Sequence, residues 1–253
     1  MESVQPHADV VAKRRDVLAA LSTPKTKPEI VESISISRST VDRAIDSLSD
    51  HGFVERDGSE YVTTYAGREA VAAYEGLLGR LRALDRARPV LDALDPDADV
   101  PPAILEGASV DRPSPEAPET PIERTIERIE GASSLCGISP VLLSRYVDVC
   151  ASLAADEAAV ELLLTDGVLE RLPETYPDGF VALAESDHVS IFAVTEAPPY
   201  SIWLAEHDDG PVGGFVVFSE SGVAGAISND TPAMVEWVRG EYDRLKRDAD
   251  RLV

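Results

Sequence analysis

The chain has 253 residues, enough for two domains, and carries 46 Asp and Glu against 23 Lys and Arg, a formal net charge of -23. This acidity opposes nonspecific attraction to nucleic-acid phosphates. The sequence contains no recognisable signal peptide and no apolar run approaching the roughly 18 residues of a membrane span, so we expect a cytoplasmic protein with no membrane contact.

The first two predicted elements are helices. Apolar residues recur at helical spacing on one face of residues 10–21. A shorter helix follows, because Thr26 and Glu29 can form a capping box and Pro28 suits a first helical turn. Residues 34–36 are then expected to form the turn that leads into a third helix.

The third predicted helix, over residues 37–48, has the chemistry of a DNA recognition helix. Its apolar residues, from Val41 to Leu48, form one face that a small domain would bury. A good N-cap begins it, and its outward side chains offer guanidinium and hydroxyl groups to base edges and phosphates. The predicted DNA contacts from this helix are Ser37, Arg38, Ser39, Thr40 and Arg43.

A β-hairpin is predicted after this helix. Strand-forming residues at 53–56 and 61–64 flank a turn at 57–59, an arrangement typical of the wing in a winged helix. Residues 1–68 hold 9 Lys and Arg against 11 Asp and Glu, so most of the acidity lies outside them. Four more DNA contacts are predicted near the second helix and the wing: Lys25, Lys27, Arg56 and Tyr61.

Residues 1–68 resemble the winged helix-turn-helix domains of archaeal and bacterial transcription regulators. The resemblance rests on Ser-Arg-Ser-Thr-Val-Asp-Arg at 37–43, Gly-Phe-Val-Glu-Arg at 52–56, and Thr-x-x-Gly-Arg at 64–68. It implies a sequence-specific transcription regulator that binds double-stranded DNA. The alternative is a winged-helix module that binds protein without binding DNA, because function lies in sites and not in folds.

A long helix is predicted over residues 66–94. Its apolar stripe could pack on the winged domain or pair with the same helix of a second chain. We favour a homodimer, whose two-fold symmetry suits a pseudo-palindromic DNA site. The stripe consists of Val71, Tyr74, Leu78, Leu81 and Leu84.

Residues 95–121 hold seven prolines among acidic residues, which predicts a linker, although the apolar piece at 103–110 could add an edge strand to the next domain. The sequence therefore predicts four regions. They are a winged helix-turn-helix at 1–68, a linker or dimerisation helix at 69–94, an acidic proline-rich linker at 95–121, and an effector or dimerisation domain at 122–253.

The last region alternates predicted strands and helices, which indicates an α/β domain with a mixed sheet. A βαβ unit is predicted from a strand at 134–138, a helix at 140–155 and a strand at 160–165. Consecutive antiparallel strands and a closing helix from Thr231 should follow. The fold class of the whole chain is α+β or α/β, and these later strands are predicted at 189–194, 200–204, 214–218 and 222–227.

Residues from about 100 to 253 resemble the effector domain called the methanogenesis regulatory protein middle domain, found in archaeal regulators. The resemblance rests on Ala-Ser-Ser-Leu-Cys-Gly-Ile-Ser ending at residue 139, Leu-Leu-Leu-Thr ending at 165, and Gly-Ala-Ile-Ser-Asn-Asp from 225 with Glu-Trp at 236–237. It implies an effector domain attached to a DNA-binding domain. A more distant resemblance links this region to the phospholipase-D-like sensor domain of archaeal sugar-responsive regulators.

The composition is also typical of a salt-accumulating, haloarchaeal-type protein, with a large acidic excess, few Lys and many Arg, Asp, Ala and Val. In molar salt the Debye length is about 3 Å, so the surface carboxylates repel one another only weakly. The alternative is an ordinary acidic cytosolic protein.

Enzymatic motifs are missing from the sequence. It contains no Gly-x-Ser-x-Gly, no phosphate-binding loop, no His-Glu-x-x-His, and no His-x-Lys of the phospholipase D type. Cys136 and Cys150 lie 14 residues apart without a neighbouring His, which predicts core thiols instead of a zinc site or a disulfide framework. We therefore expect a non-enzyme that needs no cofactor and no metal.

A small-molecule effector, if one is sensed, should bind at the strand ends of the βαβ unit, where open α/β sheets place their ligands. A domain that only dimerises would need no such pocket, and the aromatic candidates could equally be core residues. The candidate effector contacts are Ser139, Thr165, Asp166, Tyr200, Trp203 and Asn229.

Overall fold

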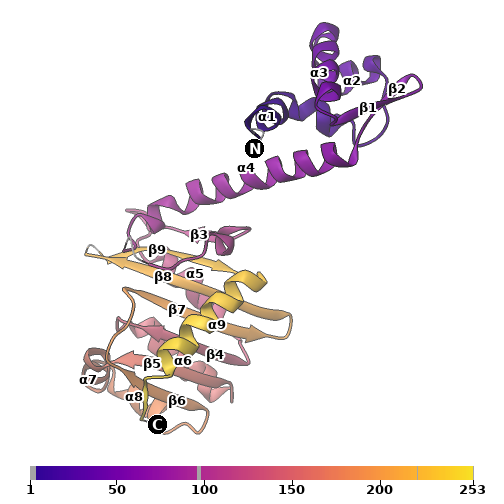
Figure 1. Cartoon of the computed structure of the whole chain (residues 1–253). Coiled ribbons are helices and arrows are strands. Elements are labelled where there is room, and N and C mark those ends of the chain that lie inside the picture. The colour runs from indigo at the N-terminus through magenta and orange to yellow at the C-terminus, as the bar shows by residue number, and fades with distance from the viewer. Residues whose placement is uncertain (1–3, 96–97, 221, 253) are drawn as a thin grey trace. The chain divides into compact units, whose positions relative to one another are not determined.

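A computed structural model describes residues 4–95, 98–220 and 222–252 (Figure 1). The chain divides into two compact units between Leu81 and Arg82, within helix α4 (Tyr65–Leu91). The first half of α4 packs on the core of the first unit through Val71 and Tyr74. Its second half belongs to the core of the second unit, where Val90 is completely buried.

The first unit is a winged helix-turn-helix, as the sequence predicts. Helix α2 begins with the expected capping box, in which Thr26 N donates to Glu29 Oε2 at 2.8 Å. It ends at Ser35, which adopts a left-handed conformation with φ 53°. The elements are α1 (Gln5–Ala20), α2 (Lys27–Ile34), α3 (Arg38–Asp50), β1 (Val54–Asp57), β2 (Glu60–Thr63) and the start of α4.

Hydrogen bonds hold the β1–β2 wing against the helices of this unit. Thr63 Oγ1 donates to Leu21 O at 2.6 Å, at the end of α1. Lys25 pairs with Tyr61 as an antiparallel bridge, with N–H···O distances of 3.1 and 2.8 Å. The segment before α2 is therefore tied to the wing by main-chain bonds, which fixes the wing relative to the helix-turn-helix.

Gly67, in the first turn of α4, has no room for a side chain. A Cβ there would lie 2.0 Å from Phe53 O, a main-chain atom that cannot move without shifting the hairpin. We expect Gly67→Ala to lower the free energy of unfolding by about 2–4 kcal/mol in denaturant titrations, although Ala is the better helix former. The control is Gly76→Ala, where nothing lies within 4 Å and stability should stay equal or rise. An unchanged midpoint for Gly67→Ala would contradict this packing.

The second unit contains a mixed sheet with the strand order β10-β6-β5-β4-β7-β8-β9-β3. Strands β4, β5 and β6 pair in parallel, and the remaining pairs are antiparallel, which confirms the predicted mixed sheet. The strands are β3 (Ser109–Asp111), β4 (Ser134–Ser139), β5 (Ala159–Thr165), β6 (Val189–Val194), β7 (Tyr200–His207), β8 (Gly210–Ser219), β9 (Gly222–Asn229) and β10 (Asp250–Arg251).

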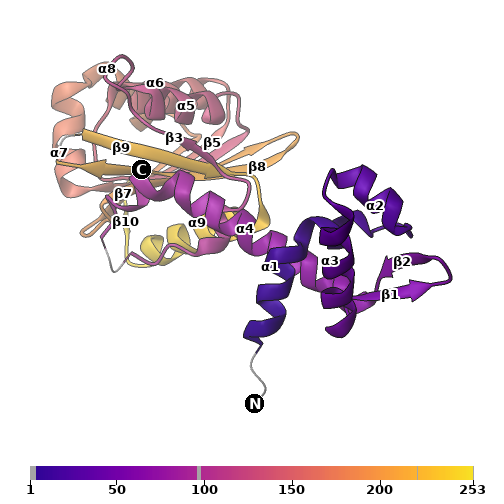
Figure 2. The ribbon, with the colours of Figure 1, turned by 90° about the horizontal axis from the view of Figure 1, so that it is seen from above.

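Helices cover both faces of this sheet, and Figure 2 shows α5 and α6 on one face and α9 on the other. Because side chains alternate along a strand, Trp203 of β7 joins the core under α5 and α6, whereas Tyr200 and Ile202 join the core under α9. The helical elements of this unit, besides the end of α4, are η1 (Pro102–Leu105), α5 (Thr120–Ile129), α6 (Ser144–Ala155), α7 (Asp166–Thr175), α8 (Pro177–Ala184) and α9 (Pro232–Lys246).

Strand β6 differs from its prediction. The sequence pattern placed it in a run of consecutive antiparallel strands, but it pairs in parallel with β5. The reason is the crossover through α7 and α8, two helices that the sequence analysis did not predict. Helix α6 also begins at Ser144 and not at residue 140, because residues 140–143 form a loop after β4.

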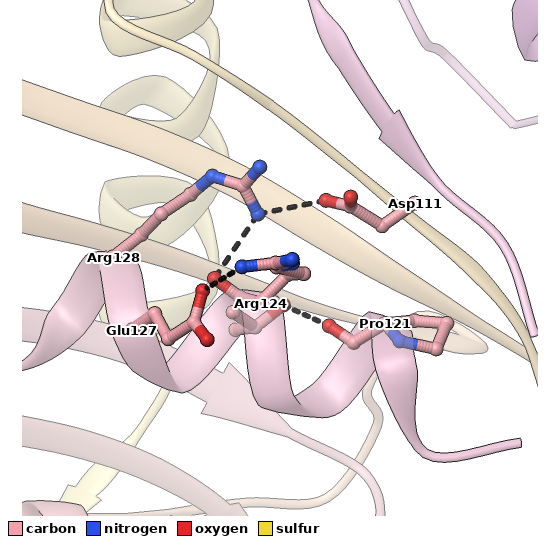
Figure 3. Close-up of polar contacts among 6 residues, drawn as sticks. Asp111, Pro121, Arg124, Glu127 and Arg128 are labelled. Carbon is pink, nitrogen blue, oxygen red and sulfur yellow. Dashed lines mark hydrogen bonds and ion pairs between the residues drawn. The ribbon is translucent and has the colours of Figure 1, made fainter. Parts of the chain in front are cut away.

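The residues of the predicted linker at 95–121 that the structure describes do not form a separate linker. They belong to the second unit. Ile104 of η1 is completely buried, and β3 pairs with β9 at the sheet edge, in the region where an edge strand was expected. Arg128 of α5 donates to Asp111 Oδ2 at 2.7 Å and to Arg124 O at 3.0 Å (Figure 3). This half-buried ion pair fastens the edge strand to α5.

Candidate functional site

The N-terminal turn of α3 presents a cluster of hydroxyl groups. Ser37 is the N-cap, and its Oγ accepts a hydrogen bond from Thr40 N at 3.2 Å. The same Oγ lies 2.8 Å from Thr40 Oγ1 and 3.1 Å from Ser39 Oγ. Ser37 and Ser39 are exposed, and Thr40 is half-buried. The cluster therefore lies at the positive end of the helix dipole, where phosphate oxygens are favoured.

Two exposed arginines accompany this cluster. Arg43 Nε donates to Ser39 O at 3.2 Å, which holds the arginine stem along the outer face of α3. The Arg38 side chain makes no hydrogen bond or ion pair within the described residues, and its charge helps to lower the pKa of Asp42. Opposite to them, Val41, Ala44, Ile45 and Leu48 are buried in the core. The structure thus brings together the predicted recognition residues on the solvent-exposed side of α3.

Three of the other predicted residues meet between α2 and the wing. The Tyr61 ring has Lys27 Nζ 5.5 Å from its centroid and the Arg56 guanidinium carbon 6.0 Å from it. Arg56 Nε also donates to Gly58 O at 2.9 Å, in the turn of the wing. Arg56 is exposed, so this cluster gives the wing one accessible positive charge.

Lys27 is partly neutralised by Asp42, which the sequence analysis did not include among the site residues. Its Nζ donates to Asp42 Oδ1 at 2.7 Å, joining α2 to α3. This hydrogen bond raises the pKa of Lys27 and lowers the pKa of Asp42. Lys27 therefore stabilises the helix pair, and it offers a phosphate less free charge than the prediction assumed.

Lys25 is also engaged within its own unit. Its Nζ donates to Ala20 O, at the end of α1, and to Thr23 Oγ1 at 2.9 Å.

Sequence reasoning missed Tyr65, whose side chain is 72% exposed and whose ring centroid lies 5.9 Å from the Arg68 guanidinium carbon. The only sequence indication of this pair was its place in the Thr-x-x-Gly-Arg motif at 64–68.

In the second unit, two of the six predicted effector residues come together. Ser139 and Trp203 line a cavity of about 80 Å³ at the end of β4. Ser139 Oγ donates to Val141 O at 2.8 Å and lies 3.2 Å from Ser201 Oγ, a further lining group. The expected strand end of the βαβ unit therefore carries a cavity.

The other four predicted effector residues do not line this cavity. Tyr200 is buried on the opposite face of the sheet, where its ring centroid lies 6.2 Å from that of Phe215, and burial raises its pKa. Thr165 is half-buried before α7, and Asp166 is exposed in the first turn of that helix. Sequence reasoning grouped Tyr200 with Trp203 without considering that a three-residue spacing puts them on opposite faces.

Asn229 has a structural role that explains its burial. Its Nδ2 donates to Glu106 O at 2.6 Å and to Ile104 O at 3.3 Å. Its Oδ1 accepts from the main-chain N of Asp230 at 2.9 Å and of Thr231 at 3.3 Å. The side chain thereby joins the end of β9 to η1 and to the start of α9.

The cysteines form neither a disulfide nor a metal site. Cys136 is half-buried and Cys150 is buried, both as free thiols, and burial raises the pKa of each to about 12. In residues 4–95, 98–220 and 222–252, no group of three His, Cys, Asp or Glu side chains could hold a metal ion. Within the same ranges, no helix has both the length and the apolar character of a membrane span.

Three solved structures are similar to the chain only at low identity. The archaeal chromatin protein TrmBL2 is 12% identical over 99% of this chain and 100% of its own, with a TM-score of 0.45. An IclR homolog from Microbacterium sp. strain HM58-2 is 14% identical over 94% and 97%, with a TM-score of 0.27. HmgR of Pseudomonas aeruginosa is 15% identical over 96% and 98%, with a TM-score of 0.24. No curated protein matches the sequence.

Two family models match the sequence and together span both units. Residues 7–86 match the HVO_A0261 N-terminal domain. Residues 118–248, just over half of the chain, match the middle domain of the methanogenesis regulatory protein FilR1. The chain therefore belongs to the family of the FilR1 middle domain.

Proposed function

We propose that this chain is a transcription regulator that binds double-stranded DNA in a sequence-specific manner. The observation that carries the proposal is the exposed face of α3, where Arg38 and Arg43 flank the hydroxyl cluster at the helix N-terminus. The FilR1 middle-domain family, which takes its name from a regulatory protein, supports the same role. The proposal assigns no catalytic step to the chain.

In this proposal, α3 enters the major groove and its two arginines bind base edges together with Ser39 and Thr40. The Ser37 end of the helix faces a phosphate, because unpaired main-chain N–H groups and the helix dipole favour an anion there. Arg56, at the wing, contacts the neighbouring DNA backbone. Positive charge comes mainly from the arginines, since Lys27 is paired with Asp42.

Chromatin immunoprecipitation followed by sequencing tests this proposal in the cell. We expect enrichment of a limited set of promoter-proximal sites that share one sequence motif. The runner-up function is a winged-helix module that binds protein only. Uniform recovery of genomic DNA, with no shared motif, would contradict the DNA-binding proposal and favour that module.

We also propose that the chain forms a homodimer through α4. Leu77 and Leu81, both in the first unit, are each 52% exposed, and their spacing of four residues places them on one side of the helix. Val71 and Tyr74, which the sequence pattern assigned to the same stripe, pack on the core of the first unit instead. Paired helices of this kind would present two recognition helices to a pseudo-palindromic site.

The dimer proposal predicts a change of mass on substitution. Size-exclusion chromatography with light scattering should give twice the 27.2 kDa chain mass for the native chain. The Leu77→Glu/Leu81→Glu variant should give a single chain mass, because buried charges without partners oppose association. Val181→Glu, at a 49% exposed position of α8, is the control and should remain dimeric. A monomeric native chain at micromolar concentration would refute the proposal.

The charge distribution supports the proposal that this protein works in a salt-rich cytoplasm. The buried polar side chains in the described part of the chain are Thr, Ser and Asn, so the carboxylates lie in exposed or half-buried positions. We propose that molar salt screens this surface, because the Debye length in molar salt is about 3 Å.

We also propose that the second unit senses a small molecule through the cavity at the end of β4.

A further inference from the structure

The cavity at the end of β4 lies inside the second unit, on the face of the sheet covered by α5 and α6. Residues of β4, β5 and β7 form its floor, and the loop at 140–143 together with α6 contributes to its walls. Ser139 and Ser201 contribute hydroxyl groups that already contact each other at 3.2 Å. The cavity therefore occupies the carboxyl end of a parallel strand in a βαβ unit, a frequent position for ligands.

Two buried polar atoms on the lining residues lack partners. Trp203 Nε1 and Tyr146 Oη are both inaccessible to solvent, and neither makes a well-formed hydrogen bond with another described residue, although the Ser201 hydroxyl lies near Tyr146 Oη. Trp203 as a whole is only 5% exposed. Burial raises the pKa of Tyr146, so its hydroxyl keeps its proton at neutral pH. Both groups can thus donate a hydrogen bond, and buried donors are normally satisfied.

The rest of the lining limits the kind of molecule that fits. The described residues around the cavity are aliphatic, aromatic or small, and none of them is charged. A carboxylate or ammonium ligand would be buried there without a counter-charge, which is strongly unfavourable. At about 80 Å³, the space is smaller than the roughly 150 Å³ cavity known to admit benzene, so the ligand must be small.

We propose that this cavity binds a small uncharged molecule with an apolar carbon skeleton and a carbonyl oxygen, which accepts a hydrogen bond from Tyr146 Oη. This inference rests on the effector-sensing part of the proposed function and names the chemistry of the effector. Ordered water is the competing occupant, because it too could satisfy both donors.

Titration calorimetry of the full-length chain without DNA tests the proposal, with acetone, which is smaller than benzene, as the probe. We expect saturable binding of acetone and none of acetate. In the Tyr146→Phe variant, the affinity for acetone should fall about tenfold, whereas the affinity for isobutene, an apolar molecule of the same shape, should stay the same. Tyr146→Phe should fold normally, because it keeps the ring and removes only a buried hydroxyl without a well-formed hydrogen bond.

Tyr176→Phe is the matched control, since Tyr176 packs against the same core but does not line the cavity. It should bind acetone as the native chain does. Absence of saturable binding to the native chain would overturn the proposal and leave water as the occupant. Equal acetone affinity in Tyr146→Phe and the native chain would also overturn it. Because no DNA is present, either failure leaves the DNA-binding proposal unaffected.

Discussion

Arg38→Ala and Arg43→Ala should each weaken specific DNA binding by about ten- to hundredfold, the loss of 1–3 kcal/mol expected when a bidentate contact to a base is removed. Both side chains are exposed, and neither packs in the core of the first unit. The winged helix-turn-helix should therefore keep its native circular dichroism. Mobility-shift titration on a bound fragment measures the effect, and the double variant should show no specific complex.

Arg171→Ala is the matched control for these variants. Arg171 is exposed on α7 in the second unit, so the substitution removes one positive charge without touching α3. Its DNA affinity should stay within about twofold of the native value. If Arg38→Ala and Arg43→Ala both bind with undiminished affinity, α3 is not the recognition element.

Asn229→Asp should lower the free energy of unfolding of the second unit by about 3 kcal/mol. The native Nδ2 donates to Glu106 O and Ile104 O, and a carboxylate of the same shape would set an oxygen against both carbonyls. Two buried carbonyl groups would lose their donor, and the new charge would be only 7% exposed. Denaturant titration followed by circular dichroism at neutral pH measures the loss.

The reciprocal substitution Asp230→Asn is the control, because Asp230 is exposed and its change should alter stability by less than about 0.5 kcal/mol. The pair of variants also separates the structural role of Asn229 from its predicted effector role. If Asn229→Asp is as stable as the native chain, the clamp between β9 and η1 does not contribute as described.

The first unit could be predicted well because its determinants are local. The Thr26–Glu29 capping box, the Ser37 cap and the apolar spacing within α3 all act over a few residues. Helical periodicity alone was enough to place Arg38 and Arg43 on the outer face. The Lys27–Asp42 pair was out of reach, because it joins side chains 15 residues apart on two different helices.

The second unit was harder to predict because its determinants are long-range. Pro173 and Pro177 interrupt the helical pattern of α7 and α8, which hid the crossover that makes β6 parallel. Proline density likewise suggested a linker around Ile104, whose burial depends on distant strands and on α9. The cavity combines residues near 139, 146 and 201–203, which only the tertiary fold brings together.

The central claim is that α3 gives this chain sequence-specific DNA binding. The most direct test is selection of fragments from a genomic library by the purified full-length chain, sequenced in parallel with selection by the Arg38→Ala/Arg43→Ala variant. We predict that the native chain enriches fragments sharing one motif and that the variant enriches none. Failure of the native chain to enrich any motif, or equal enrichment by the variant, would contradict the claim.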